Sequence, residues 1–333
     1  MTEVIHKVLN TIKDAEEDWD EAVLDHPFLN RNILTALEIT NPCGQQYHLF
    51  YKNDLNSVIV TYRLNLNIFT YWKGNLSIPV RVIGIPCSVS QCGYVIGTET
   101  QVDVYNAIQN LKGATLCLNI PDDRQFKGFS SGETLPSYKM KLSWLCFDEY
   151  LTSLRSHYRY RIRKALQKGE NLKISTLVGN RLFDESLYAL YLEVYNRSEF
   201  KLEKLPITYF KEFPANITVF SAKGQKIAFI QYMENKDELL FLFGGMDYAT
   251  NGQYDTYMNM LLEIIRIGIK RRVKGIDLGQ TAGKTKMRLG ATASFRGMAA
   301  RHANPMINFI VGKLMPTLSL RLEETSYNVY KGD

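Results

Sequence analysis

The order strand, loop, helix, strand between residues 239 and 279 constrains the fold more than any other feature of this chain. The strands are 239–243 and 276–279, joined by a loop at 244–252 and a helix at 254–271. A crossover of this length predicts two parallel strands with a right-handed connection. One side of the helix must be buried, because apolar and aromatic residues recur there at helical spacing: Tyr254, Tyr257, Met258, Leu261, Leu262, Ile265 and Ile269.

A similar order occurs in the first half of the chain, with strand 80–85, loop 86–97, helix 100–111 and strand 115–120. The length of 333 residues suits about two domains. The repetition therefore predicts an α/β protein with mixed sheets and two copies of one fold. The breakers between Pro121 and Pro136 favour a crossover near residue 145, which gives domains 1–145 and 146–333.

Composition narrows the class of protein. Hydrophobic residues make up 45% of the chain and charged residues 22%, as in globular proteins, and the net charge is +6. We see no apolar run long enough for a membrane span and no basic-then-apolar start, so we expect a cytoplasmic protein. The five Cys form no CxxC pair and the five His are scattered, so we expect no metal.

The small residues of loop 244–252 are a candidate anion site. Gly244, Gly245 and Gly252 lead into a helix that starts near Tyr254. A helix N-terminus offers free N–H groups and a positive dipole, which suit a phosphate or an anionic reaction centre. The alternative is that these glycines only turn the chain, since neither a Walker motif nor GxGxxG is present.

Polar residues are denser between Asp277 and Gly290, just past the second parallel strand. Open α/β sheets usually bind ligands at this end of their strands. Amide and hydroxyl groups there can orient a substrate, and the cations can engage phosphate or carboxylate groups. A solvated basic loop is the alternative. The candidate residues are Gln280, Thr281, Lys284, Lys286 and Arg288.

A third candidate is the basic helix between residues 155 and 168, where Arg159 and Arg163 alternate with Tyr158 and Tyr160. Cations and aromatic rings together suit a phosphate-rich ligand. The alternative is a solvated helix face. No helix-turn-helix, RNP or zinc-finger signature is present, so we expect no sequence-specific DNA binding.

The second half resembles the Fem-like branch of the GNAT acyltransferase superfamily. The resemblance covers about residues 145–300, and a weaker one extends to the first half. It rests on YLTSLRSHYRYRIRKA (150–165), YALYLEVYNRS (188–198), FLFGGMDY (241–248), GIDLGQT (275–281) and KMRLG (286–290). It implies two tandem GNAT-like domains, the first of them non-catalytic. It also implies transfer of an acyl group to an amine, with the donor in a gap between strands 239–243 and 276–279.

The resemblance leaves the donor open between acetyl-CoA or another acyl-CoA and aminoacyl-tRNA, because the pyrophosphate signature of GNAT enzymes is not found at 244–257. It implies an amine acceptor, either a small molecule or a cell-wall precursor. The Gly244 and Gly245 N–H groups would hold the oxyanion, Asp247 or Asp277 would be the base, and Tyr248 is a candidate proton donor. The alternative function is a non-catalytic binding module for an anionic or nucleotide-linked ligand.

Overall fold

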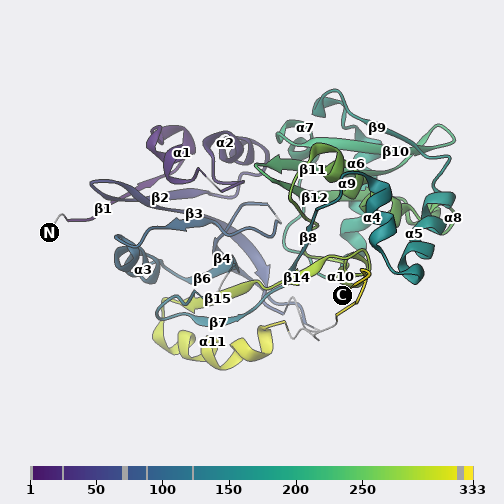
Figure 1. Ribbon diagram of the computed structural model, residues 1–333. Helices are drawn as coiled ribbons and strands as arrows, with labels where there is room; N and C mark the ends of the chain where they lie inside the picture. Colours follow the sequence, from purple (N-terminus) through teal and green to yellow (C-terminus); the bar gives the residue numbers. More distant parts are fainter. Residues whose placement is uncertain are drawn as a thin grey trace. The chain divides into compact units, whose positions relative to one another are not determined.

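The computed structural model describes residues 3–24, 26–69, 74–87, 89–121, 124–320 and 326–332. The chain divides into two compact units. Unit 1 comprises Met1–Leu135, Phe200–Tyr209 and Phe295–Leu322, and unit 2 comprises Pro136–Glu199, Phe210–Ser294 and Glu323–Asp333. Each unit is built on its own mixed sheet (Figure 1). The predicted α/β class is confirmed.

The sheet of unit 1 has the strand order β1-β2-β3-β4-β6-β15-β7, and β5 pairs with β3. Its one parallel pair among the described residues joins β4 to β6, with Ile83 opposite Cys117. The strands are β1 (Ile5–Leu9), β2 (Gln46–Lys52), β3 (Asp54–Asn67), β4 (Ser77–Ile83), β5 (Tyr94–Ile96), β6 (Ala114–Ile120), β7 (Ser130–Glu133) and β15 (Gly297–His302).

Helix α3 (Gln101–Gln109) joins the parallel strands of unit 1 and buries Val104 and Ile108 against Ile83 and Cys117. The neighbouring residues Val82 and Leu116 point to the opposite face, because side chains alternate along a strand, and there they meet Met315 of another helix. The unit's remaining helices are η1 (Ile12–Asp14), α1 (Asp18–Ala22), α2 (Arg31–Thr40) and α11 (Pro305–Leu318).

The sheet of unit 2 has the strand order β14-β8-β13-β12-β11-β10-β9, with β12 parallel to β13. The strands are β8 (Ser137–Lys141), β9 (Lys173–Thr176), β10 (Asn216–Ala222), β11 (Gln225–Asn235), β12 (Glu238–Met246), β13 (Gly275–Asp277) and β14 (Thr292–Ser294). The helices are α4 (Phe147–Ser153), α5 (Ser156–Lys168), η2 (Asn180–Leu182), α6 (Glu185–Arg197), α8 (Tyr248–Tyr254), α9 (Thr256–Arg271) and α10 (Gly283–Met287). Helix α7 (Ile207–Glu212) is divided between the two units after Tyr209.

The two sheets exchange strands, so the units are interleaved and do not follow the predicted division into 1–145 and 146–333. After β7 the chain leaves the first sheet, and β8 pairs with β13 and β14 in the second. After β14 the chain returns, and β15 pairs with β6 and β7. The crossover falls between Leu135 and Pro136, because β8 completes the second sheet.

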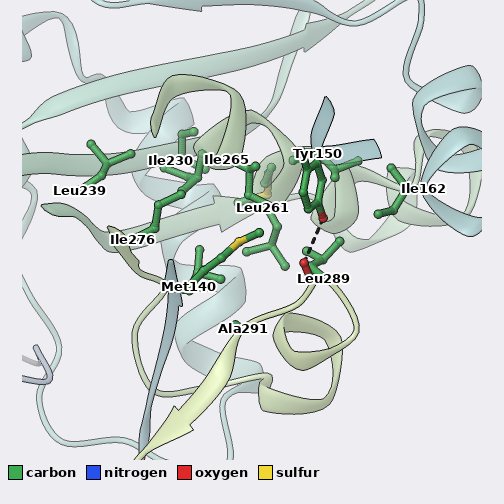
Figure 2. Packing of buried hydrophobic residues seen from close by; sticks show 14 of the residues in the cluster. Met140, Tyr150, Ile162, Ile230, Leu239, Leu261, Ile265, Ile276, Leu289 and Ala291 are labelled. Atoms are coloured by element: carbon green, nitrogen blue, oxygen red, sulfur yellow. Dashed lines mark hydrogen bonds between the residues drawn. The ribbon is translucent and has the colours of Figure 1, made fainter. Parts of the chain in front are cut away.

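The core of unit 2 forms where α9 crosses its sheet. Leu261 and Ile265 of α9 pack on Ile230 and Ile276 from β11 and β13 (Figure 2). These side chains belong to the predicted apolar stripe or to neighbouring strands, and they are almost completely buried. This packing fixes β12 and β13 as neighbours at the start of their parallel pair.

Candidate functional site

Strands β12 and β13 pair only briefly and then separate. Glu238, Leu239 and Leu240 lie opposite Gly275, Ile276 and Asp277. β13 ends there, whereas β12 continues along β11 to Met246. The register with β11 shifts by one residue at Leu242, and a bulge of this kind bends a strand. Residues 241–244 are half-buried although they lie in a central strand.

Gly279 and Lys286 lie at the point where the two strands separate. A Cβ atom on Gly279 would lie 3.5 Å from the Phe241 carbonyl oxygen and 3.9 Å from Lys286 Nζ. Lys286 is only 2% exposed, and its Nζ lies 5.8 Å from the centre of the Tyr138 ring. Burial lowers the pKa of Lys286 from 10.5 to about 7, and Asp277 opposes that shift. Both protonation states are therefore populated near neutral pH.

Asp277 is the carboxylate that faces this buried lysine. It is 2% exposed and accepts hydrogen bonds from Ser137 Oγ at 2.9 Å and from the Gly279 N–H at 2.8 Å. Its negative charge favours the protonated form of Lys286. The hydrogen bond to Gly279 also fixes the turn after β13, where Gly279 has a φ of +74°, a conformation that glycine adopts without strain.

Two tyrosines fix the segment that carries Lys286. The Tyr150 hydroxyl donates to the Leu289 carbonyl at 3.0 Å (Figure 2), and the Tyr330 hydroxyl donates to the Gly290 carbonyl at 3.3 Å. The Leu289 N–H in turn donates to the Lys286 carbonyl at 3.0 Å. The position of the Lys286 backbone is therefore set by rings packed in or against the core of unit 2.

The structure brings together only two of the predicted residues of segment 277–290, Asp277 and Lys286. Lys284 of α10 and Arg288, the residue that caps its C-terminus, share the opposite, exposed side, because residues four apart lie on one helix face. Arg288 lies over the Tyr327 ring at 5.4 Å. Thr281 is also exposed and Gln280 is half-buried. The segment is thus neither a uniform cationic loop nor entirely solvated.

The prediction of a glycine loop at 244–252 is wrong, because these residues form the end of β12 and helix α8. A Cβ atom on Gly244 would lie 2.8 Å from Met260 Cε, and one on Gly245 would lie 2.3 Å from Phe229 Cε1. These two glycines allow helices and neighbouring side chains to pack closely on β12. Gly252 lies inside α8, and Tyr254, at its last position, is buried.

Helix α8 covers the N-terminus of α9, where the phosphate site was expected. Asn251 Oδ1 accepts the Tyr257 N–H at 3.1 Å. The junction residue Asp255 brings a carboxylate to this end of the helix and forms an ion pair with Lys168 Nζ at 3.3 Å. The N-terminus of α9 therefore already has an amide acceptor and a negative charge, which disfavour an added phosphate.

Asp247 and Tyr248 do not join the Asp277 and Lys286 pair. Asp247 lies seven residues beyond Leu240, the partner of Asp277, which is roughly 20 Å at ~3.3 Å per residue. Its carboxylate caps α8 and accepts the Ala249 N–H at 2.8 Å. The Tyr248 ring lies 4.2 Å from the Arg197 guanidinium. The placement supports structural roles for both residues.

The basic helix α5 splits into a bound part and an exposed part. Arg159 NH1 donates to the Leu154 carbonyl at 3.1 Å, beyond the end of α4, so Arg159 has a structural contact. Lys168 donates to the Gly252 carbonyl at 3.0 Å and thereby ties α5 to α8. Arg163 is exposed, together with Arg161 and Lys164. These last three cations are exposed to solvent.

Sequence reasoning missed Gln231, which lies opposite Phe243 beside the bulge. Its side chain is fully buried, and neither Oε1 nor Nε2 has a hydrogen-bond partner among the described residues. An unpaired buried carboxamide costs ~1–3 kcal/mol and calls for an explanation. The available signal was a single amide in the apolar run from Ile227 to Met233.

No family model and no curated protein matches the sequence. Solved structures share its fold at low identity. FemX has a TM-score of 0.57 and 11% identity over 89% of this chain and 96% of its own. L-PGS from Bacillus licheniformis has a TM-score of 0.54 and 13% identity over 92% and 98%. A tandem GNAT protein from the clavulanic acid biosynthesis pathway has a TM-score of 0.52 and 9% identity over 91% and 99%.

The chain therefore has the tandem GNAT fold predicted from the resemblance, and FemX shares its fold. Within the described ranges, no cluster of three or more His, Cys, Asp or Glu side chains could hold a metal ion. None of the helices that the structure describes is long and apolar enough to cross a membrane.

Proposed function

We propose that unit 2 is an N-acyltransferase whose reacting groups meet where β12 and β13 separate. The observation that carries this proposal is the buried Lys286, which lies beside Gly279 at the point of separation and has a pKa of about 7. A group that titrates near the working pH can both accept and donate a proton. The tandem GNAT fold supports the reaction class without identifying the substrates.

The step would proceed as follows. The neutral amine of Lys286 removes a proton from an acceptor amine, whose nitrogen attacks the carbonyl carbon of an acyl ester. The tetrahedral intermediate then expels the ester oxygen, which takes the proton from the Lys286 ammonium. An amide and an alcohol result, and Lys286 is neutral again. Asp277 is a positioning residue, because it orders the Gly279 turn and biases the protonation of Lys286.

The donor we favour is an aminoacyl ester carried on tRNA. The covered N-terminus of α9 and its Asp255 carboxylate disfavour the diphosphate of CoA at that position. The exposed cations of α5, with Arg163 among them, offer phosphate contacts instead. The Lys168 contacts hold α5 beside α8 and the start of α9. Aminoacyl-tRNA is among the donors that the resemblance to Fem-like proteins leaves open.

An acyl-CoA thioester is the second candidate. The tandem GNAT protein from the clavulanic acid biosynthesis pathway was solved in a form without AcCoA, which makes this thioester the donor to compare with the ester. With this donor the lysine chemistry is unchanged, and a thiol leaves in place of an alcohol. The acceptor in both cases is a primary amine, on a small molecule or on a cell-wall precursor.

The test follows cleavage of aminoacyl-tRNA and of acetyl-CoA, each with and without a panel of primary amines. We expect aminoacyl-tRNA to be consumed and an amide to form, and Lys286→Met to slow this about 100-fold. The matched control is Lys270→Ala, because Lys270 is an exposed lysine of α9. If the protein cleaves acetyl-CoA and does not cleave aminoacyl-tRNA, acyl-CoA replaces aminoacyl-tRNA as the proposed donor. Equal rates for wild type and Lys286→Met would refute the role of Lys286.

A further inference from the structure

Helix α11 is firmly attached to unit 1 along one side. It packs on β7 and β15 (Figure 1), where Met315 is buried and Asn308 Oδ1 accepts the His302 N–H at 3.0 Å. Asn304 caps its first turn by accepting the Met306 N–H at 2.9 Å. The helix is thus formed and anchored without any partner molecule.

The opposite side of α11 is apolar and exposed. Met306 is 79% exposed and Phe309 is 68% exposed. Three more large apolar side chains share this side, which their helical spacing brings together: Ile307, Ile310 and Leu314. Such a cluster on one surface helix marks an interaction site more strongly than scattered apolar residues do.

The charged residues of α11 and of its flanking segment are of one sign. The only charged residue in α11 is Lys313, whose Nζ lies 5.5 Å from the Phe309 ring centre. The unit 1 segment Phe295–Leu322, which contains α11, has four Lys and Arg and no Asp or Glu. A lysine can cover an apolar surface with its methylene groups while its ammonium group contacts an anion.

The positive charge of α11 favours one kind of partner for its exposed face over another. In a symmetric dimer of this chain, α11 would meet a copy of itself, and the two Lys313 side chains would have no carboxylate on either helix to pair with. An anionic lipid surface supplies both an apolar layer and negative head groups. It therefore complements both properties of the exposed face.

We propose that the exposed face of α11 binds the surface of an anionic phospholipid bilayer. The helix, at ~21 Å for its 14 residues, would lie parallel to the bilayer surface with its five apolar side chains among the upper acyl chains. Lys313 would contact a head-group phosphate. This inference stands independently of the proposed acyl transfer, because it rests on unit 1 alone.

The test is co-sedimentation of the full-length protein with vesicles of phosphatidylcholine, with and without phosphatidylglycerol. We expect binding to vesicles that contain phosphatidylglycerol, weakened by salt. The double variant Phe309→Ser/Ile310→Ser should lower the partition coefficient about tenfold or more, and Lys313→Glu about fivefold. The control is Leu24→Ser/Val102→Ser, which removes two exposed apolar side chains elsewhere in unit 1.

Thermal unfolding establishes that each variant is folded before binding is compared. The proposal is overturned if wild type does not sediment with phosphatidylglycerol vesicles, or if the double variant binds as well as wild type. Concentration-dependent dimerisation that the double variant abolishes would assign the face to a second copy and likewise overturn the proposal. Donor cleavage without vesicles should be the same in the double variant and wild type, which separates this test from that of the acyl transfer.

Discussion

Both units interrupt the same strand of their common fold, and they do so in different ways. In unit 2, β12 is interrupted by the single bulged residue Leu242. In unit 1 the corresponding strand is split in two, since β4 and β5 both pair with β3 and are separated by the excursion from Gly84 to Gly93. The interruption lies next to the parallel pair in each unit.

The excursion in unit 1 closes tightly at its base. The Gly84 N–H donates to the Val60 carbonyl at 3.3 Å, and the Val60 N–H donates to the Gly93 carbonyl at 2.8 Å. A Cβ atom on Gly93 would lie 2.4 Å from the Gly84 carbonyl oxygen, so only glycine fits there. Ile85 and Cys87 of the excursion are buried. The chain thus covers the end of its own parallel pair in unit 1.

Asn119 of unit 1 and Gly279 of unit 2 are at equivalent positions, and they differ in what lies beyond the end of the parallel pair. Each follows the last parallel pair by two residues, and each has a positive φ, +57° and +74° respectively. Asn119 Nδ2 donates to the Val89 carbonyl of the excursion at 2.8 Å. Gly279 has no side chain, and Lys286 Nζ lies beside it. The same backbone position therefore carries an amide that binds the excursion in unit 1 and a glycine beside Lys286 in unit 2.

The largest expected effect comes from Gly279→Asn, which gives unit 2 the side chain of unit 1. Asparagine tolerates a positive φ, so we expect the fold to persist while the amide occupies the space beside Lys286. Donor cleavage should fall about 100-fold, which corresponds to ~2.7 kcal/mol. Gly224→Asn is the control, because Gly224 also has a positive φ and a Cβ atom there would meet nothing within 4 Å. Full activity in Gly279→Asn would contradict the functional difference that we infer between the equivalent positions Asn119 and Gly279.

The reverse change in unit 1 is Asn119→Ala, for which we expect a loss of about 2 kcal/mol in the free energy of unfolding. The variant loses the hydrogen bond to Val89 and places alanine at a positive φ. Asn119→Gly separates the two causes, since glycine keeps the backbone relaxed. Denaturant unfolding measures both variants. Donor cleavage by the folded protein should remain unchanged, and its loss would place unit 1 in the reaction.

The sequence predicted local secondary structure better than it predicted which strands pair with one another. Hydrophobic spacing identified α9 and the parallel strands around it, because an amphipathic stripe is a local property. The exchange of β8 and β15 depends on pairing between residues more than 130 positions apart in the chain, which no local pattern encodes. The role of Gly245 was not predicted for a related reason. Gly245 lies close to the backbone of α6 at Tyr191, and its neighbours in sequence do not reveal that contact.

The candidate site was predicted only in part. Lys286 and Asp277 were both identified, but the cations of α10 were treated alike. Lys284 and Lys286 are two residues apart, and on a helix this spacing points them in opposite directions. Burial of Lys286 turns a cation expected to bind substrate into a group that titrates near neutral pH. That change depends on the packing of Tyr138 and Asp277 around it, which only the fold provides.

The burial of Lys286 also predicts how stability depends on pH. Because its pKa is about 7 in the folded protein and ordinarily 10.5, the unfolded chain binds more protons between these values. The free energy of unfolding should therefore rise with pH from about 7 to 10.5, by at most ~1.4 kcal/mol per pH unit from this group. Denaturant unfolding of wild type and Lys286→Met isolates the contribution, and parallel pH curves for the two proteins would rule it out.

The smallest expected effect concerns Gln231, beside the bulge of unit 2. Gln231→Met replaces a buried carboxamide that has no partner among the described residues with an apolar side chain of similar size. We expect the free energy of unfolding to increase by about 1 kcal/mol, since the unpaired group is removed. Gln225→Met is the control, because Gln225 is exposed on the same strand. A stabilised Gln231→Met that cleaves donor more slowly would assign the amide to substrate binding, whereas a destabilised one would show that it has a partner in the folded protein.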